Sequence, residues 1–168
     1  MVEKILPFTE SQLEAILRDF PTPVYIYDER GIRESARRLN AAFSWVPGGF
    51  RNYFAVKATP NPNIVQITNE EGCGADCSSM LELVTAEMLG ISGENVMFTS
   101  NNTDALEFRK AREMGAIINL DDITFIEFLE KNAGLPGLIC FRYTPSDADN
   151  STIGKKGKSK FGLREDQI

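Results

Sequence analysis

Short apolar runs recur along the chain at an almost constant interval, and stretches with helical periodicity separate them. The runs begin near Arg51, Cys73, Asn95, Ala116 and Gly137, so that successive runs are 22, 22, 21 and 21 residues apart. Residues that favour strands fill the runs, whereas the stretches between them place apolar residues about 3.6 positions apart. A steady alternation of strand and helix predicts βα units that form a parallel sheet.

Glycines and capping residues mark the ends of the predicted helices. Glycine is the preferred residue just beyond a helix C-terminus, and here it closes four helical stretches, at Gly72, Gly90, Gly115 and Gly134. Ser79 and Glu82 have the spacing of a capping box, which predicts a helix start after the second run.

The first 50 residues follow a different order. Thr9 and Gln12 predict a capped helix that ends at a proline-containing turn. Residues 24–27 are apolar and aromatic, which predicts a short strand, and Asp28 then predicts the start of a second helix that reaches about Phe43.

Five βα units fit either an open doubly wound sheet or the first part of an eight-stranded barrel. The regular spacing favours the barrel because a doubly wound sheet often has a break at its switch point. The first strand is also not followed by the glycine-rich dinucleotide fingerprint. We therefore expect an α/β fold, a parallel (β/α)8 barrel of which this chain holds about the first five strands and leaves two sheet edges unpaired.

Composition narrows the class of protein. The 168 residues are 42% hydrophobic and 25% charged, as in ordinary globular domains, and the net charge of −6 disfavours nucleic-acid binding. No stretch reaches the roughly 20 apolar residues of a membrane span, and the N-terminus lacks the apolar core of a signal peptide. We expect a cytoplasmic protein with no membrane partner.

The chain has three cysteines and no histidine. An odd number of cysteines without scaffold-like spacing disfavours a disulfide framework, and a zinc site would need further ligands. We therefore expect reduced, buried thiols at Cys73 and Cys77, no metal site, and no imidazole chemistry from this chain.

Lys57 is the first candidate for chemistry. It ends the first apolar run, which predicts a lysine carried into the core at a strand end. Desolvation would lower the pKa of such a lysine, and a neutral amine forms a Schiff base with an aldehyde. The alternative is a lysine that extends its charged end into water.

Polar residues also follow the later strands. Functional residues of βα folds collect at the carboxyl ends of the strands, where Asp76, Asp122 and Arg142 are expected. Each has a structural alternative, because the two aspartates could cap helices and the arginine could form an ion pair. Their joint placement with Lys57 on one rim favours a site. The lysine-rich run at 155–160 indicates instead a solvated loop within a long polar stretch.

Four motifs, in order, resemble a known family, the pyridoxal-phosphate-dependent decarboxylases of ornithine, diaminopimelate and arginine, which have an alanine-racemase-like barrel. The motifs are Tyr-Phe-Ala-Val-Lys-Ala with the following Asn-Pro-Asn (53–63), Gly-Cys-Gly-Ala-Asp-Cys-Ser-Ser-Met-Leu-Glu-Leu (72–83), Phe-Arg-Tyr-Thr-Pro (141–145) and Lys-Phe-Gly-Leu (160–163). The resemblance runs from about Thr22 to Leu163.

The resemblance implies a cofactor and a role for three residues. Lys57 would hold pyridoxal phosphate as a Schiff base and assist proton transfer, Asp76 would lie beside the lysine amine, and Arg142 would lie near the phenolic oxygen of the cofactor ring. The substrate would be a small amino acid. The Lys-Ala-x-Pro-Asn pattern favours diaminopimelate, decarboxylated to lysine, over ornithine, although the extra Pro60 and the missing asparagine at position 144 indicate a divergent branch.

Other parts of such an enzyme are not in this chain. The family's ring-stacking histidine, its phosphate-binding loops and its C-terminal β-domain all come later in the sequence. The resemblance thus predicts that residues 1–27 associate partly with that β-domain and that residues 28–168 are the first portion of the barrel. It also predicts a homodimer for the full-length protein, and a chain that alone neither binds the cofactor tightly nor turns over.

Three alternatives stay open at this point. They are an ornithine- or arginine-type decarboxylase, an alanine-racemase-like enzyme, and a non-catalytic relative that binds pyridoxal phosphate or regulates another protein. The presence of Lys57, Asp76 and Arg142 together disfavours the non-catalytic relative.

Overall fold

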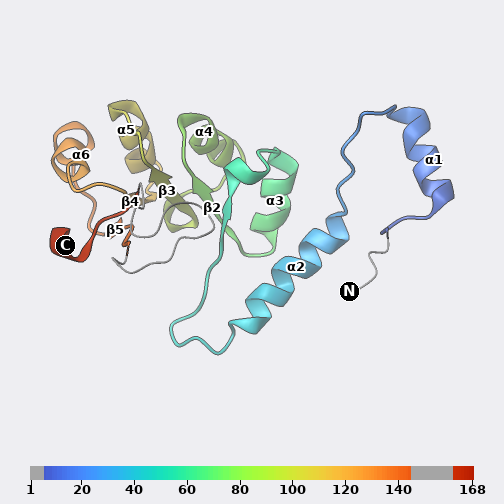
Figure 1. Cartoon of the computed structure of the whole chain (residues 1–168), viewed down its shortest axis with the longest axis horizontal. Coiled ribbons are helices and arrows are strands. Elements are labelled where there is room, and N and C mark those ends of the chain that lie inside the picture. The colour runs from blue at the N-terminus through green and yellow to red at the C-terminus, as the bar shows by residue number, and fades with distance from the viewer. Residues whose placement is uncertain (1–5, 145–160) are drawn as a thin grey trace.

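The computed structural model describes residues 6–144 and 161–168 (Figure 1). The lysine-rich run and two motif positions, Pro145 and Lys160, lie outside the described residues. Two helices come first, α1 (Glu10–Asp19) and α2 (Glu29–Ala42). Within the described part of the chain, no helix is both long and apolar enough to cross a bilayer.

Strands and helices alternate through the rest of the chain. In chain order they are β1 (Tyr53–Ala55), α3 (Pro62–Glu70), β2 (Gly74–Cys77), α4 (Met80–Met88), β3 (Val96–Ser100), α5 (Ala105–Glu113), β4 (Ile117–Leu120), α6 (Phe125–Ala133) and β5 (Ile139–Phe141), with single 3-10 turns η1 (Val56–Ala58), η2 (Gly93–Asn95) and η3 (Glu165–Gln167). The sheet order is β1-β2-β3-β4-β5, and every pairing is parallel. The predicted parallel α/β sheet is confirmed.

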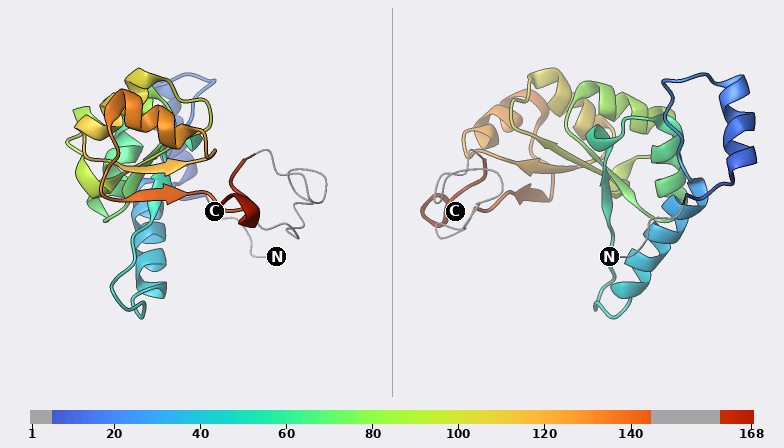
Figure 2. Two further views of the ribbon diagram at one scale, coloured as in Figure 1. Left: turned by 90° about the vertical axis from the view of Figure 1, so that its left-hand side faces the viewer. Right: turned by 45° about the vertical axis from the view of Figure 1, so that its right-hand side comes forward.

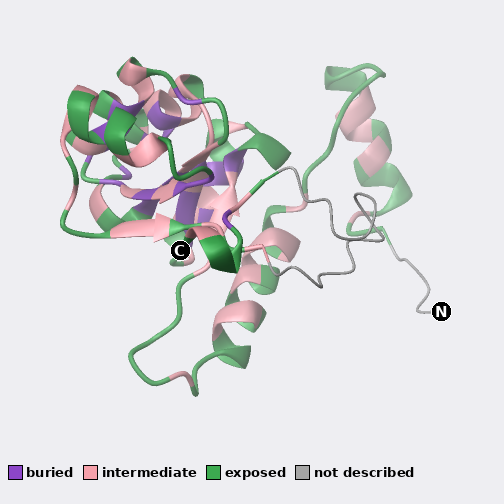
Figure 3. Ribbon diagram, turned by 60° about the vertical axis from the view of Figure 1, so that its left-hand side comes forward, coloured by how far each residue is buried: buried purple, intermediate pink, exposed green. Residues whose placement is uncertain are grey.

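The helices α3 to α6 cover one face of the curved sheet (Figures 1 and 2). Successive strand residues point to opposite faces, so alternate positions enter the core between sheet and helices. Val96 and Phe98 of β3 and Ile118 and Leu120 of β4 are at most 1% exposed and pack there with Phe108 of α5 (Figure 3). The residues between them face the other side of the sheet, which is the inner side of a barrel wall.

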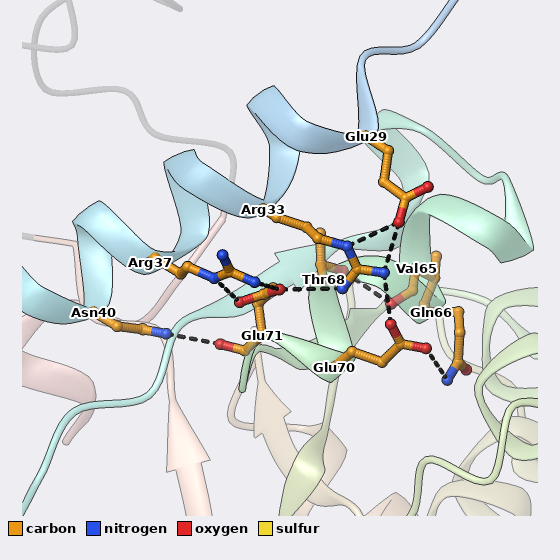
Figure 4. Close-up of polar contacts among 9 residues, drawn as sticks. All are labelled: Glu29, Arg33, Arg37, Asn40, Val65, Gln66, Thr68, Glu70 and Glu71. Carbon is orange, nitrogen blue, oxygen red and sulfur yellow. Dashed lines mark hydrogen bonds and ion pairs between the residues drawn. The ribbon is translucent and has the colours of Figure 1, made fainter.

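Helix α2 docks on α3 through ion pairs (Figure 4). Arg33 lies 2.7 Å from Glu70 and 3.1 Å from Glu71, and Arg37 lies 2.7 Å from Glu71. The side-chain amide of Asn40 also donates to the backbone carbonyl of Glu71, at 2.8 Å. No residue of α2 is fully buried, and these polar contacts join the helix to α3.

The capping signals are confirmed at several ends. Thr9 and Gln12 form a full capping box. Ser79 accepts a hydrogen bond from the backbone N–H of Glu82, but the Glu82 carboxylate bonds the N–H of Ser78 instead of Ser79. Asp28 occupies the N-cap position of α2 without a side-chain hydrogen bond. The four helix-closing glycines all have positive φ, which confirms their predicted position.

The predicted strand at 24–27 is wrong. These residues pair with no strand of the described sheet, and Tyr25 is 89% exposed. A strand needs a neighbour to satisfy its backbone N–H and C=O groups, and an apolar run alone does not supply one. Helix α1 stands apart from the sheet (Figure 1), whereas Ile26 and Tyr27 line a pocket together with Phe54 of β1. The division at residue 27 stays a prediction.

Candidate active site

Lys57 lies just past the end of β1, in the turn η1. Its side chain is exposed, so the expectation of a lysine buried in the core is wrong. The physical reason is that the chain leaves the strand at Ala55, and the turn places Val56, 1% exposed, in the core position while Lys57 stays exposed to solvent. Lys57 makes no hydrogen bond or ion pair with any residue that the structure describes, which leaves its amine available to a ligand.

The turn after Lys57 leads directly into α3. The side chain of Asn61 caps this helix by accepting from the backbone N–H of Asn63 at 3.0 Å, and Pro62 occupies the first helical position. Proline is favoured there because its missing N–H would have no partner inside the helix. The Asn-Pro-Asn motif therefore fixes the direction in which the chain leaves the lysine.

Asp76 lies on the inner face of the sheet. Its neighbours Ala75 and Cys77 are buried against the helices, so the alternation of the strand turns Asp76 to the other side. Its Oδ1 atom is buried and accepts no hydrogen bond from the described residues. A buried oxygen normally has a donor, so this atom is a place where a bound group would supply one.

Burial raises the pKa of the Asp76 carboxyl, and the Thr99 hydroxyl together with the charges of Lys57 and Arg142 acts in the opposite direction. Burial also raises the pKa of the Asp121 carboxyl, and the charges of Arg142 and Lys57 oppose that rise. Lys57 and Arg142 therefore act on both carboxyls, which indicates that all four groups gather at the carboxyl end of the sheet.

Arg142 forms an ion pair that supports its structural alternative. Its Nη1 atom lies 3.1 Å from Oδ1 of Asp121 and donates to Oδ2 at 3.4 Å. The Asp121 side chain is 4% exposed and that of Arg142 is 40% exposed. The arginine thus has a buried partner on one side and an accessible surface on the other. Sequence reasoning did not single out Asp121, because its pairing with Arg142 depends on the register of β4 and β5.

Asp122 has a local structural role. Its Oδ1 atom accepts from the backbone N–H of Thr124 at 2.8 Å and from the Thr124 hydroxyl at 2.6 Å. These hydrogen bonds lower the pKa of the Asp122 carboxyl. Asp122 therefore stabilises the turn that leads into α6. This role is similar to the helix cap that was its structural alternative.

Two polar side chains extend the inner face beside Asp76. Asn119 lies opposite Thr99 in the register of β3 and β4, and its amide donates to the Thr99 hydroxyl at 3.3 Å. Glu82 lies close by at the start of α4, where its carboxylate accepts from the backbone N–H of Ser78 at 2.8 Å. The sequence assigns Glu82 to a capping box, whereas Asn119 stands between two apolar residues and was not singled out.

Residues 161–163 lie beside the end of β5 and close over Arg142. The N–H of Leu163 donates to the carbonyl of Arg142 at 2.7 Å, and the N–H of Gly162 donates to the carbonyl of Asp121 at 3.2 Å. Gly162 has a φ of +92°, and a Cβ there would lie 2.5 Å from the hydroxyl of Thr144. The Phe161 ring centroid is 5.8 Å from Cζ of Arg142.

The cysteines are free thiols, as predicted for Cys73 and Cys77, both of which are buried. Burial raises the pKa of the Cys77 thiol to about 12, so it carries almost no thiolate at neutral pH. Among the residues that the structure describes, no three acidic, cysteine or histidine side chains gather as a metal site would require.

An apolar pocket of about 620 Å³ lies elsewhere, between α2 and the amino ends of β1 and β2. Ile32, Leu39 and Phe54 contribute to its lining. It is separate from the carboxyl-end rim, so the candidate site does not include it.

Comparison with known proteins shows which family this chain belongs to. The model of the pyridoxal-dependent decarboxylase family, pyridoxal binding domain, matches residues 29–167. Protein TabA of Pseudomonas amygdali pv. tabaci is 41% identical over 158 residues, which are 93% of this chain and 36% of that protein. Diaminopimelate decarboxylase of Methanothermobacter thermautotrophicus is 35% identical over 150 residues, which are 88% of this chain and 35% of that enzyme.

A solved structure has the same fold. The crystal structure of diaminopimelate decarboxylase from M. jannaschii superimposes with a TM-score of 0.77 at 24% identity, and covers 90% of this chain and 38% of that one. Its similarity supports the barrel as the fold. The chain spans 35% to 36% of the length of the two curated relatives.

Proposed function

Because this chain belongs to the family of pyridoxal-dependent decarboxylases, through their pyridoxal-binding domain, we propose that it supplies the first part of the active site of an amino-acid decarboxylase. The observation that carries the proposal is the pair formed by Lys57 and Asp76. An amine without a partner among the described residues lies near a half-buried carboxyl whose Oδ1 atom accepts no hydrogen bond from them.

The residues of the rim fit pyridoxal phosphate. Lys57 provides an accessible primary amine that can bond to the cofactor's aldehyde carbon through Nζ. Asp76 provides the unfilled acceptor beside it, and Arg142 provides a guanidinium that can donate to the ring oxygen of the cofactor. When bound, pyridoxal phosphate supplies an electron sink for the bond that breaks.

Each side chain then has a separate task. Asp76 orients the Lys57 amine and balances positive charge near it. Arg142 fixes the ring by its oxygen edge. The Lys57 amine, when it is not bonded to the cofactor, would hold a proton on Nζ that it could deliver to the substrate carbon that loses carbon dioxide.

We propose diaminopimelate as the substrate. The support is the 35% identity to the archaeal diaminopimelate decarboxylase and the Lys-Ala-x-Pro-Asn pattern. A second candidate is another amino acid, because the identity to TabA is higher, at 41%. For either substrate, the resemblance predicts that the complete protein is a cytoplasmic homodimer. Light scattering on the complete gene product tests the dimer.

The test measures carbon dioxide release by the complete gene product, loaded with pyridoxal phosphate, from diaminopimelate, ornithine, lysine and arginine. We expect release from diaminopimelate and a loss of about 10²–10⁴-fold or more in Lys57→Ala. Lys131→Ala, an exposed lysine in the last turn of α6, is the matched control and should keep full activity.

Two results would contradict the proposal. Undiminished turnover in Lys57→Ala would remove the lysine from the chemistry. Release from another of the four amino acids, with none from diaminopimelate, would keep the decarboxylase and replace the substrate.

A further inference from the structure

Asp121 is the only buried charged residue in the described part of the chain, with 7% of its surface exposed. It follows β4 directly, on the rim that carries the candidate site. An ionised carboxylate taken out of water costs free energy unless a partner compensates for it. The position of Asp121 therefore calls for a reason beyond the packing of the core.

The partner, Arg142, is not buried in the same way. Its side chain is 40% exposed, and its Nη1 atom lies 3.1 Å from the Asp121 carboxylate. A free arginine side chain samples many rotamers, and the Asp121 carboxylate restricts them through this ion pair and through a hydrogen bond from Nη1 to Oδ2 at 3.4 Å. The buried Asp121 carboxylate is thus the fixed partner, and it holds the Arg142 guanidinium at the rim.

The backbone around the pair is fixed as well. The N–H of Arg142 donates to the carbonyl of Leu120 at 3.0 Å, and its own carbonyl accepts from Leu163 at 2.7 Å. The carbonyl of Asp121 accepts from Gly162 at 3.2 Å. The end of β4, the end of β5 and the 161–163 segment therefore meet at Asp121, and the Arg142 side chain lies between the Asp121 carboxylate and the Phe161 ring.

We propose that Asp121 is a positioning residue for cofactor binding, whose carboxylate holds the Arg142 guanidinium in the direction from which it donates to the ring oxygen of pyridoxal phosphate. The inference rests on the proposed role of Arg142. Asp121 itself acts through the arginine and touches no reacting atom.

If the ion pair were purely structural, neutralising its carboxylate would lower the melting temperature and leave cofactor affinity unchanged. Burial raises the pKa of Asp121 in spite of the charges of Arg142 and Lys57, with Asp122 adding to the rise, so the ionised carboxylate at neutral pH is a cost to folding. Asparagine has the same shape without that cost. Since Arg142 is half exposed, water can solvate it once the carboxylate is gone.

The experiment uses the complete gene product, freed of cofactor, in four forms: wild type, Asp121→Asn, Arg142→Met and the double variant. Asp122→Asn is the matched control, because asparagine also forms the turn that Asp122 makes with Thr124. The readouts are the dissociation constant of pyridoxal phosphate, from absorbance titration, and the melting temperature of the cofactor-free protein.

We expect Asp121→Asn to weaken cofactor binding about tenfold, as for the loss of one directed hydrogen bond to a charged group, with an unchanged or higher melting temperature. Arg142→Met should weaken binding at least as much. The double variant should bind no more weakly than Arg142→Met, because Asp121 acts only through the arginine. Asp122→Asn should bind like wild type.

Three outcomes would overturn the role of Asp121 while leaving the proposed function intact. They are wild-type affinity in Asp121→Asn, a fall in melting temperature or failure to fold in that variant, and additive losses in the double variant. Normal binding in Arg142→Met, or a wild-type protein that does not bind pyridoxal phosphate, would instead remove the proposed function and this inference with it.

Discussion

Asp76 has the environment of a residue kept for binding at the expense of stability. Burial raises the pKa of its carboxyl above the ordinary value of 3.8, so the folded state favours the protonated form. Stability is therefore highest below the ordinary pKa and falls as the pH rises through the raised pKa. An unfilled acceptor on Oδ1 accompanies this cost.

We predict that Asp76→Asn separates stability from function. At pH 7 the variant should unfold at the same or a higher temperature than wild type, because it buries no charge, and this difference should vanish below about pH 4. Turnover of the cofactor-loaded protein should fall by about 10²–10⁴-fold. Thermal unfolding across pH and carbon dioxide release measure the two effects; a clear loss of stability at pH 7 would contradict the assignment.

The cysteines differ in accessibility, and their reactivity should follow. Cys73 and Cys77 are buried, whereas Cys140 on β5 is half-buried. With a pKa raised to about 12, Cys77 has almost no thiolate at pH 8, and the thiolate is the form that reacts. We predict that iodoacetamide modifies Cys140 first and leaves Cys77 intact until the protein unfolds, as followed by mass spectrometry. Equal rates at Cys77 and Cys140 would disagree with the packing of β2.

At the scale of elements, a network of charged side chains joins α2 to α3. Arg33 joins Glu29 of its own helix to Glu70 and Glu71 of α3, and its hydrogen bonds, with those of Arg37 to Glu71, lower the pKa of both α3 carboxyls (Figure 4). A carboxyl with a lowered pKa contributes stability that is present above its ordinary pKa and is lost as the pH falls through the lowered one.

We predict that Arg33→Met lowers the free energy of unfolding at pH 7, and that the difference from wild type shrinks as the pH falls below the ordinary glutamate value of 4.5. Arg30→Met on the same helix is the control. The Arg30 side chain is 80% exposed, and its surface ion pair with Glu34 is long, at 3.8 Å. Urea unfolding from pH 7 to pH 3 measures both. Equal effects of the two variants would show that α2 docks by other contacts.

The order and position of the strands could be predicted from the sequence because their signals are local. The apolar runs predicted from Arg51 and Cys73 begin as strands at Tyr53 and Gly74, and the later three also begin within two residues of the expected positions. The glycines that close the helices mark the boundaries independently of the apolar pattern.

Features that depend on the neighbours of a residue could not be predicted. The apolar run at 24–27 has strand-like composition but no strand beside it. Lys57 follows an apolar strand yet lies in an exposed turn, because Val56 fills the core position. The bond between Asp121 and Arg142 joins residues 21 positions apart and exists only through the pairing of β4 with β5.

At the scale of the whole molecule, the chain has one continuous wall of a barrel. The described sheet has β1 and β5 at its two edges, with residues 161–163 beside the end of β5. Asp76 lies in β2, Lys57 lies in the turn after β1 and Arg142 directly follows β5, so the site extends from one edge of the described sheet to the other. The resemblance predicts that the histidine and the phosphate-binding loops of the family come from residues beyond these 168. We therefore expect the 168-residue chain by itself to bind pyridoxal phosphate weakly and to release no carbon dioxide.

The central claim is that Lys57 carries the cofactor, and chemical trapping tests it most directly. The complete gene product is incubated with pyridoxal phosphate, its carbon–nitrogen double bond is reduced with borohydride, and the modified peptide is identified by mass spectrometry. The account predicts a stable pyridoxyl group on Lys57 of the wild-type protein and none in Lys57→Ala. A pyridoxyl group on a different lysine, or on no lysine, would contradict it.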